Sequence, residues 1–400
     1  MLLRGAASFK LKGREAPRQD FQSRPGLMAR ETNQTAEGIL EILPEGFGFL
    51  RRLENRYQPH PSDVRVPRDL IRAQRLRSGS EIKGTVVVPA QGKKKQLAKV
   101  ELVDGAEPSQ ARERTPFRSL VSIDPFERLR IDAFNDESMR IVDLLTPIGK
   151  GQRGLIVAPP KTGKTMLLQK LAMSIAEAHP EVHLMVVLIN ERPEEVTEMR
   201  RTVRGEVLYS SSDEMSRKHV NVAEIVLERA RRLVEAGRDV VILLDSITRM
   251  ARAYNIEHRG SGRTLSGGLG AGSMTKPREF FGAARKIENG GSLTILATAL
   301  IDTGSRMDDV IFEEFKGTGN MELVLSRDLA DRRIWPAIDI SASGTRKEEK
   351  LRDPITQRRV NLLRRALSDL SPDRAMQALL RKLSETPNNE AFLESLEAAL

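Results

Sequence analysis

The segment 154–165 restricts the fold more than any other part of the chain. An apolar run at 154–157 leads into Ala158-Pro159-Pro160-Lys161-Thr162-Gly163-Lys164-Thr165, and a helical stretch follows. This order of strand, loop and helix is typical of a phosphate-binding loop, here with alanine in place of the first glycine. Lys164 can reach the β- and γ-phosphates of a nucleotide, and Thr165 offers a hydroxyl to Mg²⁺. The loop predicts an α/β nucleoside-triphosphatase that uses ATP and Mg²⁺.

Two acidic residues follow apolar runs and support hydrolysis. The run 240–244 ends at Asp245, which in this type of fold holds Mg²⁺ through water. With Ser246 after it, Asp245 would serve equally well as a helix N-cap. Glu191 follows the run 183–189, and ligands of open α/β sheets bind at the carboxyl ends of strands. Glu191 is therefore the candidate for polarising the attacking water, with a solvated loop carboxylate as the alternative.

From about residue 141 onwards, apolar runs alternate with helical stretches. The expected strands are 155–158, 183–189, 206–209, 240–244, 292–299 and 321–325. The expected helices are 164–178, 193–202, 217–236, 246–254 and the region after 358. Continuous apolar strands joined by helices predict a mainly parallel sheet that is buried on both faces. Residues 141–400 thus form one α/β domain with a helical C-terminal part.

The preceding residues have a different pattern. Five short strand-like runs separated by turn residues in 37–104 predict a small closed β-barrel such as an OB-fold. Residues 1–36 are basic and lack an apolar period, so they form a flexible arm that is either solvated or binds RNA. The stretch 105–140 is rich in proline and charge and is expected to be a linker.

Two phenylalanines in the barrel point to a nucleic-acid surface. In Gly46-Phe47-Gly48-Phe49-Leu50-Arg51, residues two apart share one face of a strand. The two rings could pack in a core, but a glycine before each leaves room for a base. Aromatic rings on an OB-fold stack bases at about 1–3 kcal/mol each. Arg51 is the candidate for neutralising phosphate.

The composition limits the partners. A net charge of +10 favours a polyanion, although a solvated basic face would have the same charge. Because the chain has no cysteine, disulfides and thiolate metal sites are excluded. No apolar run has the ~18 residues of a membrane span, and no secretory signal is evident, so a cytoplasmic protein with no membrane partner is expected.

With these elements together, the chain resembles the Rho family of bacterial transcription termination factors over about residues 37–385. The resemblance rests on 40–43 with 46–51, on 147–154, and on the segments 191–199, 244–254, 280–285, 297–305, 315–321 and 343–349. It implies a homohexameric ring of RecA-like ATPase domains, each with an OB-fold that holds single-stranded RNA. It further implies translocation along RNA and dissociation of transcription complexes, with the RNA polymerase elongation complex as a partner.

The resemblance also assigns site residues. It implies ATP contacts from Gly149-Lys150-Gly151-Gln152-Arg153-Gly154, Lys161-Thr162-Gly163-Lys164-Thr165-Met166 and Arg192. Arg346 resembles the arginine finger that acts across a subunit boundary, and Arg333 its companion. A planar, permanently charged donor suits the γ-phosphate in the transition state.

RNA contacts follow in the same way. The primary site extends from 46–51 to Asp63-Val64-Arg65 and Lys93-Lys94-Lys95. The secondary site is Thr264-Leu265-Ser266-Gly267-Gly268-Leu269-Gly270 with Arg306, in two loops expected to line a central channel.

Three departures from the family pattern stand out. Asn190 replaces the usual aspartate before Glu191, and the N-terminal helical subdomain of the family is replaced by the basic arm. Arg65 and the triple lysine stand where aromatic residues are common, so we expect weaker pyrimidine selectivity and a steeper salt dependence of RNA binding.

Two other functions remain open on the sequence alone. One is an ATP synthase- or secretion-type hexameric ATPase that does not act on RNA. The other is an RNA-binding protein that uses nucleotide only to assemble.

Overall fold

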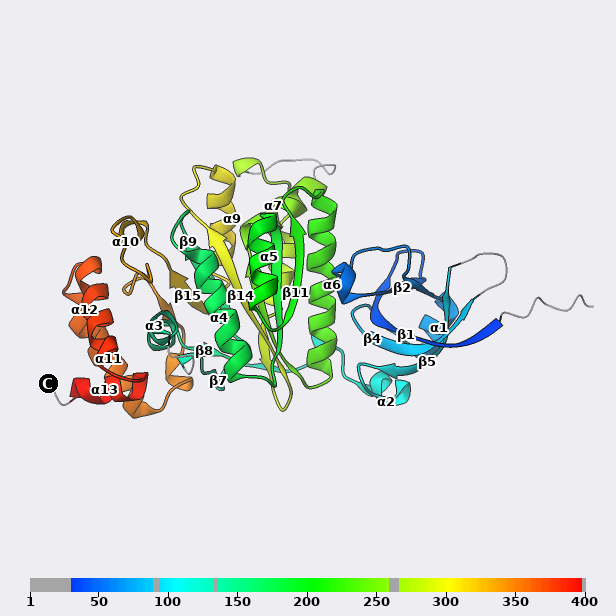
Figure 1. Cartoon of the computed structure of the whole chain (residues 1–400), viewed down its shortest axis with the longest axis horizontal. Coiled ribbons are helices and arrows are strands. Elements are labelled where there is room, and N and C mark those ends of the chain that lie inside the picture. The colour runs from blue at the N-terminus through cyan, green and yellow to red at the C-terminus, as the bar shows by residue number, and fades with distance from the viewer. Residues whose placement is uncertain (1–29, 89–93, 133–135, 259–265, 398–400) are drawn as a thin grey trace, which may run out of the picture.

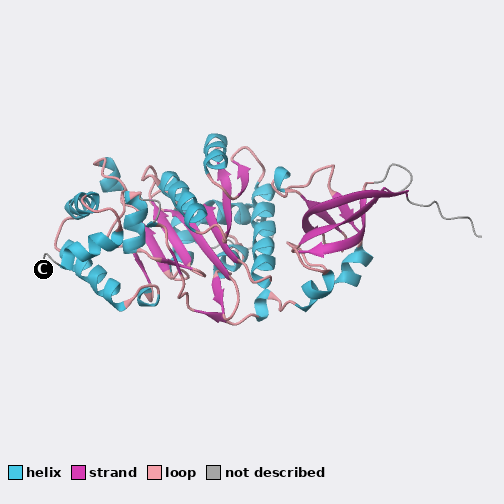
Figure 2. Cartoon of the chain, turned by 60° about the horizontal axis from the view of Figure 1, so that its bottom comes forward, coloured by secondary structure: helices cyan, strands magenta, loops and turns pink. Residues whose placement is uncertain are grey.

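The computed structural model describes residues 30–88, 94–132, 136–258 and 266–397. Figure 1 and Figure 2 show a small barrel beside a larger body, in which helices cover both faces of a sheet, and further helices lie at the C-terminal end. In these ranges no helix is long and apolar enough to cross a bilayer.

Five strands at the N-terminal side close into a barrel with the order β1-β2-β3-β5-β4, which confirms the predicted small barrel. Alternating side chains fill its interior, among them Leu40, Leu50, Ile82 and Leu97. The strands are β1 (Arg30–Ile42), β2 (Gly48–Arg51), β3 (Val64–Val66), β4 (Glu81–Val88) and β5 (Gln96–Val103).

The first strand is longer than its apolar pattern indicates. β1 begins at Arg30, and its first residues pair with the end of β4, where Arg30 is opposite Val88. The last part of the predicted arm 1–36 is therefore strand, because backbone pairing with β4 needs no apolar side chains. Residues 1–29 of that arm lie outside the described residues.

The larger body is built on a sheet with the order β11-β10-β12-β14-β9-β15-β16. The strands from β11 to β15 are parallel, which confirms the predicted mainly parallel sheet, and β16 joins in the antiparallel sense. Their bounds are β9 (Arg153–Ala158), β10 (His183–Glu191), β11 (Glu206–Ser211), β12 (Asp239–Asp245), β14 (Ser292–Leu300), β15 (Met321–Val324) and β16 (Gly344–Thr345).

Successive residues of these strands face two separate cores, as expected for a sheet that is buried on both faces. Ile156 and Leu243 pack with α4 and α5, whereas Leu155 and Ile242 pack with α6, α7, α8 and α9. These helices are α4 (Lys164–Ala178), α5 (Pro193–Thr202), α6 (Ser216–Glu235), α7 (Ile247–His258), α8 (Thr275–Gly282) and α9 (Arg306–Lys316). The short α10 (Arg327–Asp331) follows β15.

The stretch 105–140 is more ordered than the predicted linker. It contains α2 (Pro108–Glu113), β6 (Ser122–Ile123) and β7 (Arg128–Leu129), and α3 (Glu137–Leu145) begins before its end. β6 pairs with β13 (Arg285–Ile287) at the edge of the main sheet, and β7 pairs with β8 (Ile148–Gly149). These elements were not predicted because the prolines and charged residues of this stretch give no strand or helix pattern. Its strands form by pairing with other parts of the chain.

Buried ion pairs hold the barrel against the larger body. Arg229 of α6 bonds Glu81 at 2.9 Å and Asp104 at 2.7 Å, and its side chain is 5% exposed. The Tyr57 hydroxyl donates to Glu206 at 3.1 Å. Because removing one partner of a buried ion pair leaves an uncompensated charge, these contacts fix the barrel to the edge of the body at β11 and α6.

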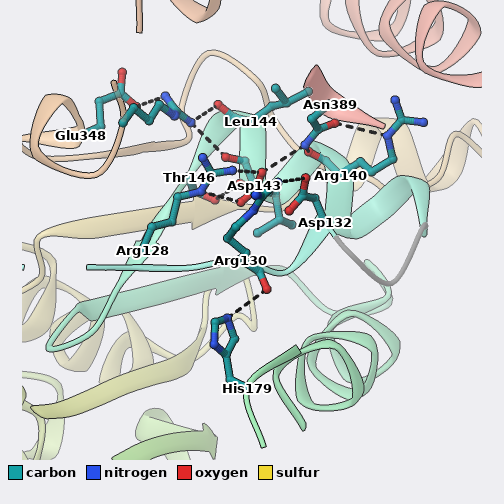
Figure 3. A network of polar contacts seen from close by, with 12 residues as sticks. Arg128, Arg130, Asp132, Arg140, Asp143, Leu144, Thr146, His179, Glu348 and Asn389 are labelled. Atoms are coloured by element: carbon teal, nitrogen blue, oxygen red, sulfur yellow. Dashed lines mark hydrogen bonds and ion pairs between the residues drawn. The ribbon is translucent and has the colours of Figure 1, made fainter. Parts of the chain in front are cut away.

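The C-terminal helices are tied to α3 by the polar network in Figure 3. Asn389 donates to the Arg140 carbonyl at 3.0 Å and to the Asp143 carboxylate at 3.1 Å, while Arg128 donates to Asp143 at 3.0 Å. Burial raises the pKa of Asp143, and the charge of Arg128 opposes that shift. The network positions α3, which also lines the cavity beside the segment 158–165. The helices are α11 (Pro354–Ser368), α12 (Pro372–Ser384) and α13 (Asn389–Glu397).

Candidate functional site

The phosphate-binding loop connects β9 to α4 near the middle of the sheet. The Thr162 hydroxyl donates to the Pro159 carbonyl at 2.7 Å, which closes the loop on itself. Gly163 has a φ of 79°, which a side chain would disfavour, and α4 begins at the next residue. The backbone N–H groups at the start of α4 therefore face the space that the loop encloses, as phosphate binding requires.

Three predicted catalytic residues meet beside this loop. The Lys164 ammonium bonds the Asp245 carboxylate and lies 3.4 Å from Glu191. Asp245 also accepts a hydrogen bond from the Thr298 hydroxyl at 2.8 Å. Both carboxylates end neighbouring strands, β10 and β12, so the parallel sheet itself brings them together.

The donor set fits a divalent cation held partly by nucleotide. One oxygen of Asp245 is buried without a hydrogen-bond partner, so it is available to a cation or to water bound to one. Thr165 presents its hydroxyl on the loop side, where it donates to Glu195 at 3.2 Å. No group of three His, Cys, Asp or Glu side chains in the described ranges could hold a metal alone. The free Asp245 oxygen and the Thr165 hydroxyl suit Mg²⁺, which usually binds one or two protein ligands together with phosphate oxygens.

Glu191 lies in an environment that suits a general base. Its side chain is 2% exposed, and Arg249 lies 3.2 Å from its carboxylate. Burial and then the charge of Asp245 raise the pKa of Glu191 to about 7, against the opposing charges of Lys164 and Arg249. A carboxylate with a pKa near neutrality can accept a proton from water and release it again, so the solvated-loop alternative is wrong.

A cavity of about 270 Å³ adjoins the loop. Thr162, Gly163 and Met166 line it from the loop side, and Trp335 lines it from the opposite side. The indole lies so close that a Cβ on Gly163 would be 2.8 Å from it. Met166 and Trp335 are 54% and 43% exposed, so a flat apolar group can reach both.

The predicted ATP segment 149–154 does not meet the loop. Arg153 and Ala158 stand at opposite ends of β9, about 16 Å apart along the strand. The segment 149–154 therefore lies where the parallel strands begin, at the end of the sheet opposite the phosphate loop. We call this end the far edge of the sheet. There Lys150 bonds Asp239 at 2.7 Å and Gln152 bonds Asn320 at 2.7 Å. Direct contact of 149–154 with ATP on the same chain is thus wrong, because a whole strand separates them.

Arg346 lies at that same far edge. It follows β16, where Thr345 pairs with Met321, and its backbone N–H donates to Asn320 at 2.9 Å. Its side chain is exposed. Arg153 is close enough that its pKa is lowered, first by burial and then by the charges of Arg285 and Arg346. Arg346 therefore belongs to a cationic edge that faces away from its own phosphate loop.

Arg192 and Arg333 lie at the loop edge of the sheet. Arg192 is exposed at the N-cap of α5, directly after Glu191. Arg333 is exposed, with a φ of 61°, and stands two residues before Trp335. Their positions suit contacts to a nucleotide or to a neighbouring subunit.

On the barrel, Phe47 and Phe49 form a half-exposed aromatic pair. Their ring centroids are 5.7 Å apart with the planes at 82°. Arg65 lies over the Phe47 ring at 4.7 Å, and Lys94 lies over the Phe49 ring at 5.2 Å. Phe47 precedes β2 rather than lying in it, so the pair is a turn residue and a strand residue. A surface of rings flanked by cations suits a base and its phosphate.

Several residues predicted to touch RNA are instead structural. Arg51 is buried and ion-paired with Glu41 and with Asp63, the latter at 2.5 Å, so neither Arg51 nor Asp63 faces solvent. Leu50 and Val64 belong to the barrel core because they occupy the inward positions of their strands. A Cβ on Gly48 would be 2.6 Å from the Glu41 carbonyl, so that glycine serves close strand packing and not base access. Gly46, with a φ of 88°, is a turn residue.

The second predicted RNA site consists of two loops that meet. A Cβ on Gly267 would be 3.0 Å from the Arg306 carbonyl, and Arg306 is exposed at the start of α9. Asn255 anchors the first loop through the Gly270 N–H at 2.7 Å. Leu269 is 2% exposed and packs in the core, so its predicted side-chain contact with RNA is wrong. Thr264, Leu265 and Lys93 lie outside the described residues, and Lys95 bonds Gln34 at 3.1 Å.

Comparison with known proteins agrees with both parts of the fold. Residues 36–109 match the Rho termination factor RNA-binding domain, and residues 138–345 match the nucleotide-binding domain of the ATP synthase alpha/beta family. The transcription termination factor Rho of Cereibacter sphaeroides is 52% identical over 365 residues, which cover 90% of this chain and 86% of that protein. The chain belongs to the Rho family of transcription termination factors.

Other Rho proteins are equally similar. Identity is 51% with the factor of Pseudomonas aeruginosa, over 91% of this chain and 88% of that one, and 52% with that of Aquifex aeolicus, over 90% and 84%. As a Rho-family member, the protein binds RNA and terminates transcription, and it carries an ATPase domain that binds ATP. The RNA-binding domain excludes the alternative of a secretion-type ATPase that does not act on RNA.

Solved structures show the ATPase fold alone. An ATPase from a bacterial type III secretion system has a TM-score of 0.60 at 20% identity, covering 78% of this chain and 93% of that one. The ATP synthase subunit NeqB has a TM-score of 0.55 at 18% identity, covering 70% and 76%.

Sequence reasoning missed two residues of the nucleotide site. Trp335 is the single tryptophan of the chain, and its position beside Arg333 and Pro336 could have marked it. Arg249 follows Asp245 by four residues on α7 and bonds both Glu191 and the Asn190 carbonyl. Asn190 has a φ of 57°, a conformation in which asparagine is enriched, so this departure from the family pattern fits its backbone.

The pKa of Glu191 sets a pH dependence. We expect kcat for ATP hydrolysis to rise about 10-fold between pH 6 and pH 8, because the ionised fraction of a carboxylate with a pKa of about 7 rises that much. The contribution of Glu191 to the free energy of unfolding changes with pH in the opposite direction. The folded pKa exceeds the ordinary glutamate value of 4.5, so protonated Glu191 favours the folded state, and this contribution is lost as pH rises through about 7.

The pH profile would be measured at saturating ATP and RNA. Glu194→Gln, which changes an exposed carboxylate on the first turn of α5, should keep the rise. Glu191→Gln should leave a low activity that does not vary over this range. A wild-type profile that is flat from pH 6 to pH 8 would contradict the assigned role.

Proposed function

We propose that the protein is an RNA-stimulated ATPase that uses hydrolysis to move along single-stranded RNA in the 5′-to-3′ direction and so dissociates transcription complexes. One observation supports the coupling above all others. The Ile301 N–H, at the start of the loop that leads to Arg306, donates to the carbonyl of Ala158, the first loop residue, at 3.3 Å. A shift of the phosphate loop is therefore transmitted directly to an RNA loop.

The roles of the residues at the nucleotide follow from their geometry. Lys164 neutralises phosphate charge, and the base lies between Met166 and Trp335. Thr165 and, through water, Asp245 would hold Mg²⁺, which supplies further neutralisation of phosphate charge when bound. Glu191, ionised, accepts a proton from the attacking water, while Arg249 keeps its carboxylate oriented.

We infer that the working form is a homohexameric ring. Arg346 cannot serve its own loop across the length of β9, but a neighbouring subunit that docks its loop on this edge would receive it. Arg333 is the proposed companion. The ring would carry RNA past Arg306 and act on the RNA polymerase elongation complex in the cytoplasm.

RNA-stimulated hydrolysis tests the proposal. Phosphate release would be measured with and without poly(C), using Lys164→Ala as the inactive control. We expect stimulation by RNA in the wild type and no turnover above background in the variant. Turnover that is equal with and without RNA would refute the coupling of hydrolysis to RNA. A wild type without turnover would refute the proposal that the protein hydrolyses ATP.

A further inference from the structure

The barrel carries a row of arginines that none of the RNA contacts above includes. Helix α1 (Arg68–Gln74) follows β3 and packs Ile71 into the barrel core. Arg68, Arg72 and the C-cap residue Arg75 are all exposed. Arg68 and Arg72 are four residues apart and therefore lie on one face of α1, and Arg75 follows at the C-cap in the left-handed conformation. Seven residues of rise make the row about 10 Å long. We call these three residues the α1 arginine row.

The charges of this row are uncompensated. None of the three arginines forms an ion pair with any residue in the described ranges of the chain. Other barrel arginines do: Arg51 is bound by Glu41 and Asp63, and Arg77, two residues after the row, bonds Glu235 of α6 at 2.6 Å. Like charges at helical spacing repel one another weakly, and an anion bound along the row would relieve this repulsion.

The row begins at the aromatic pair. The Arg68 side chain lies against the turn before Phe47, where a Cβ on Gly46 would be 3.1 Å from its Nε. Arg65, three residues earlier, lies over the Phe47 ring at 4.7 Å. A cationic surface therefore starts at the ring that would stack a base and continues along α1.

We propose that the α1 arginine row binds the phosphates of the RNA that flanks the nucleotides stacked on Phe47 and Phe49. The contacts are with the backbone, so they do not depend on sequence and they lengthen the primary site beyond the two rings. The proposal deepens the RNA-binding role of the barrel and rests on it. It also adds phosphate contacts to those expected from Arg65 and Lys94, and these contacts make the salt dependence of RNA binding steeper.

Binding of a short and a long oligonucleotide tests the row. The full chain with Arg68→Gln, Arg72→Gln and Arg75→Gln would be titrated with fluorescent oligo-C of two and of twelve nucleotides between 50 and 200 mM salt. Each lost phosphate contact on a single strand lowers the salt slope by about 0.7, so the slope for the long RNA should fall by about 2. At 50 mM salt this corresponds to a loss of affinity of about 10-fold or more for the long RNA and little for the short one.

The matched control removes the same charge elsewhere. Arg358→Gln, Arg365→Gln and Arg374→Gln change three exposed arginines of α11 and α12 and should keep the wild-type slope. An unchanged slope in the α1 variant, or an equal fall in the control, would overturn the proposal. So would an equal loss for the short RNA, because the row lies outside the stacked nucleotides.

The ATPase assay separates this proposal from the proposed function. At saturating RNA, the α1 variant should reach the wild-type RNA-stimulated kcat with a raised RNA concentration at half-stimulation. A wild type without RNA stimulation would refute the coupled motor, whereas the binding titration would still report on the row.

Discussion

Arg346→Ala is expected to lower kcat for RNA-stimulated ATP hydrolysis by about 10³-fold or more, the range of effect that arginine fingers have in GTPases. The reason is positional. Arg346 is exposed at the far edge of the sheet from its own phosphate loop, so in the proposed ring it would stabilise transition-state charge in a neighbouring subunit. RNA affinity and folding should be unchanged, since the side chain packs in neither core. Arg358→Ala, an exposed arginine of α11, is the matched control and should keep full activity.

Mixing two inactive variants decides whether Arg346 acts between subunits. Rings assembled from Arg346→Ala and Glu191→Gln chains contain some interfaces with an intact Glu191 on one side and an intact Arg346 on the other. Activity of the mixture should therefore exceed that of either parent. If each site used its own Arg346, no subunit in the mixture would be complete, and activity would stay at the level of the parents.

Phe47→Ala combined with Phe49→Ala is expected to weaken binding of oligo-C to the barrel about 30-fold or more. Each ring contributes about 1–3 kcal/mol of stacking, and the two rings are half-exposed and adjacent at 5.7 Å. The RNA concentration at half-stimulation of the ATPase should rise in parallel, while kcat at saturating RNA changes little because the rings lie outside the nucleotide site.

The control for this variant is Phe126→Ala, which removes a ring that is 52% exposed on the larger body. Phe47→Trp with Phe49→Trp should restore affinity, since a larger ring also stacks. Wild-type affinity in the alanine variant would show that RNA uses the cations alone. A lowered free energy of unfolding with normal affinity per folded molecule would show that the rings serve packing.

Local pattern was enough to predict the order of elements around the phosphate loop. Apolar runs at the periods of strands and helices are set by burial, and burial on both faces of a sheet leaves a continuous signature in β10, β12 and β14. Asp245 and Glu191 were predictable for the same reason, because residues after parallel strands share one edge. The family resemblance added Arg346, whose residue type and turn alone would indicate a surface position.

Side-chain environment was not predictable from local pattern. Arg51 and Asp63 have the residue types of an RNA site, yet they are bound to each other in the barrel. The segment 149–154 carries the glycines of a ligand loop, but its position is set by the pairing of β8 with β7 and of β9 with its neighbours. Trp335 reaches the loop from beyond β15, through a chain path of about 170 residues that no motif spans.

The phosphate-binding loop illustrates both what the sequence determines and what only the tertiary structure determines. From sequence alone, segment 154–165 determined an α/β fold with a nucleotide site, because a strand, a glycine turn and a helix N-terminus are local features. Tertiary structure alone decided that burial raises the pKa of Glu191 to about 7, that Trp335 lines the cavity beside the loop, and that Arg346 lies at the end of the sheet away from its own loop. Desolvation, cavity shape and the side of the sheet on which a residue lies depend on groups that are distant in sequence, so only the folded chain defines them.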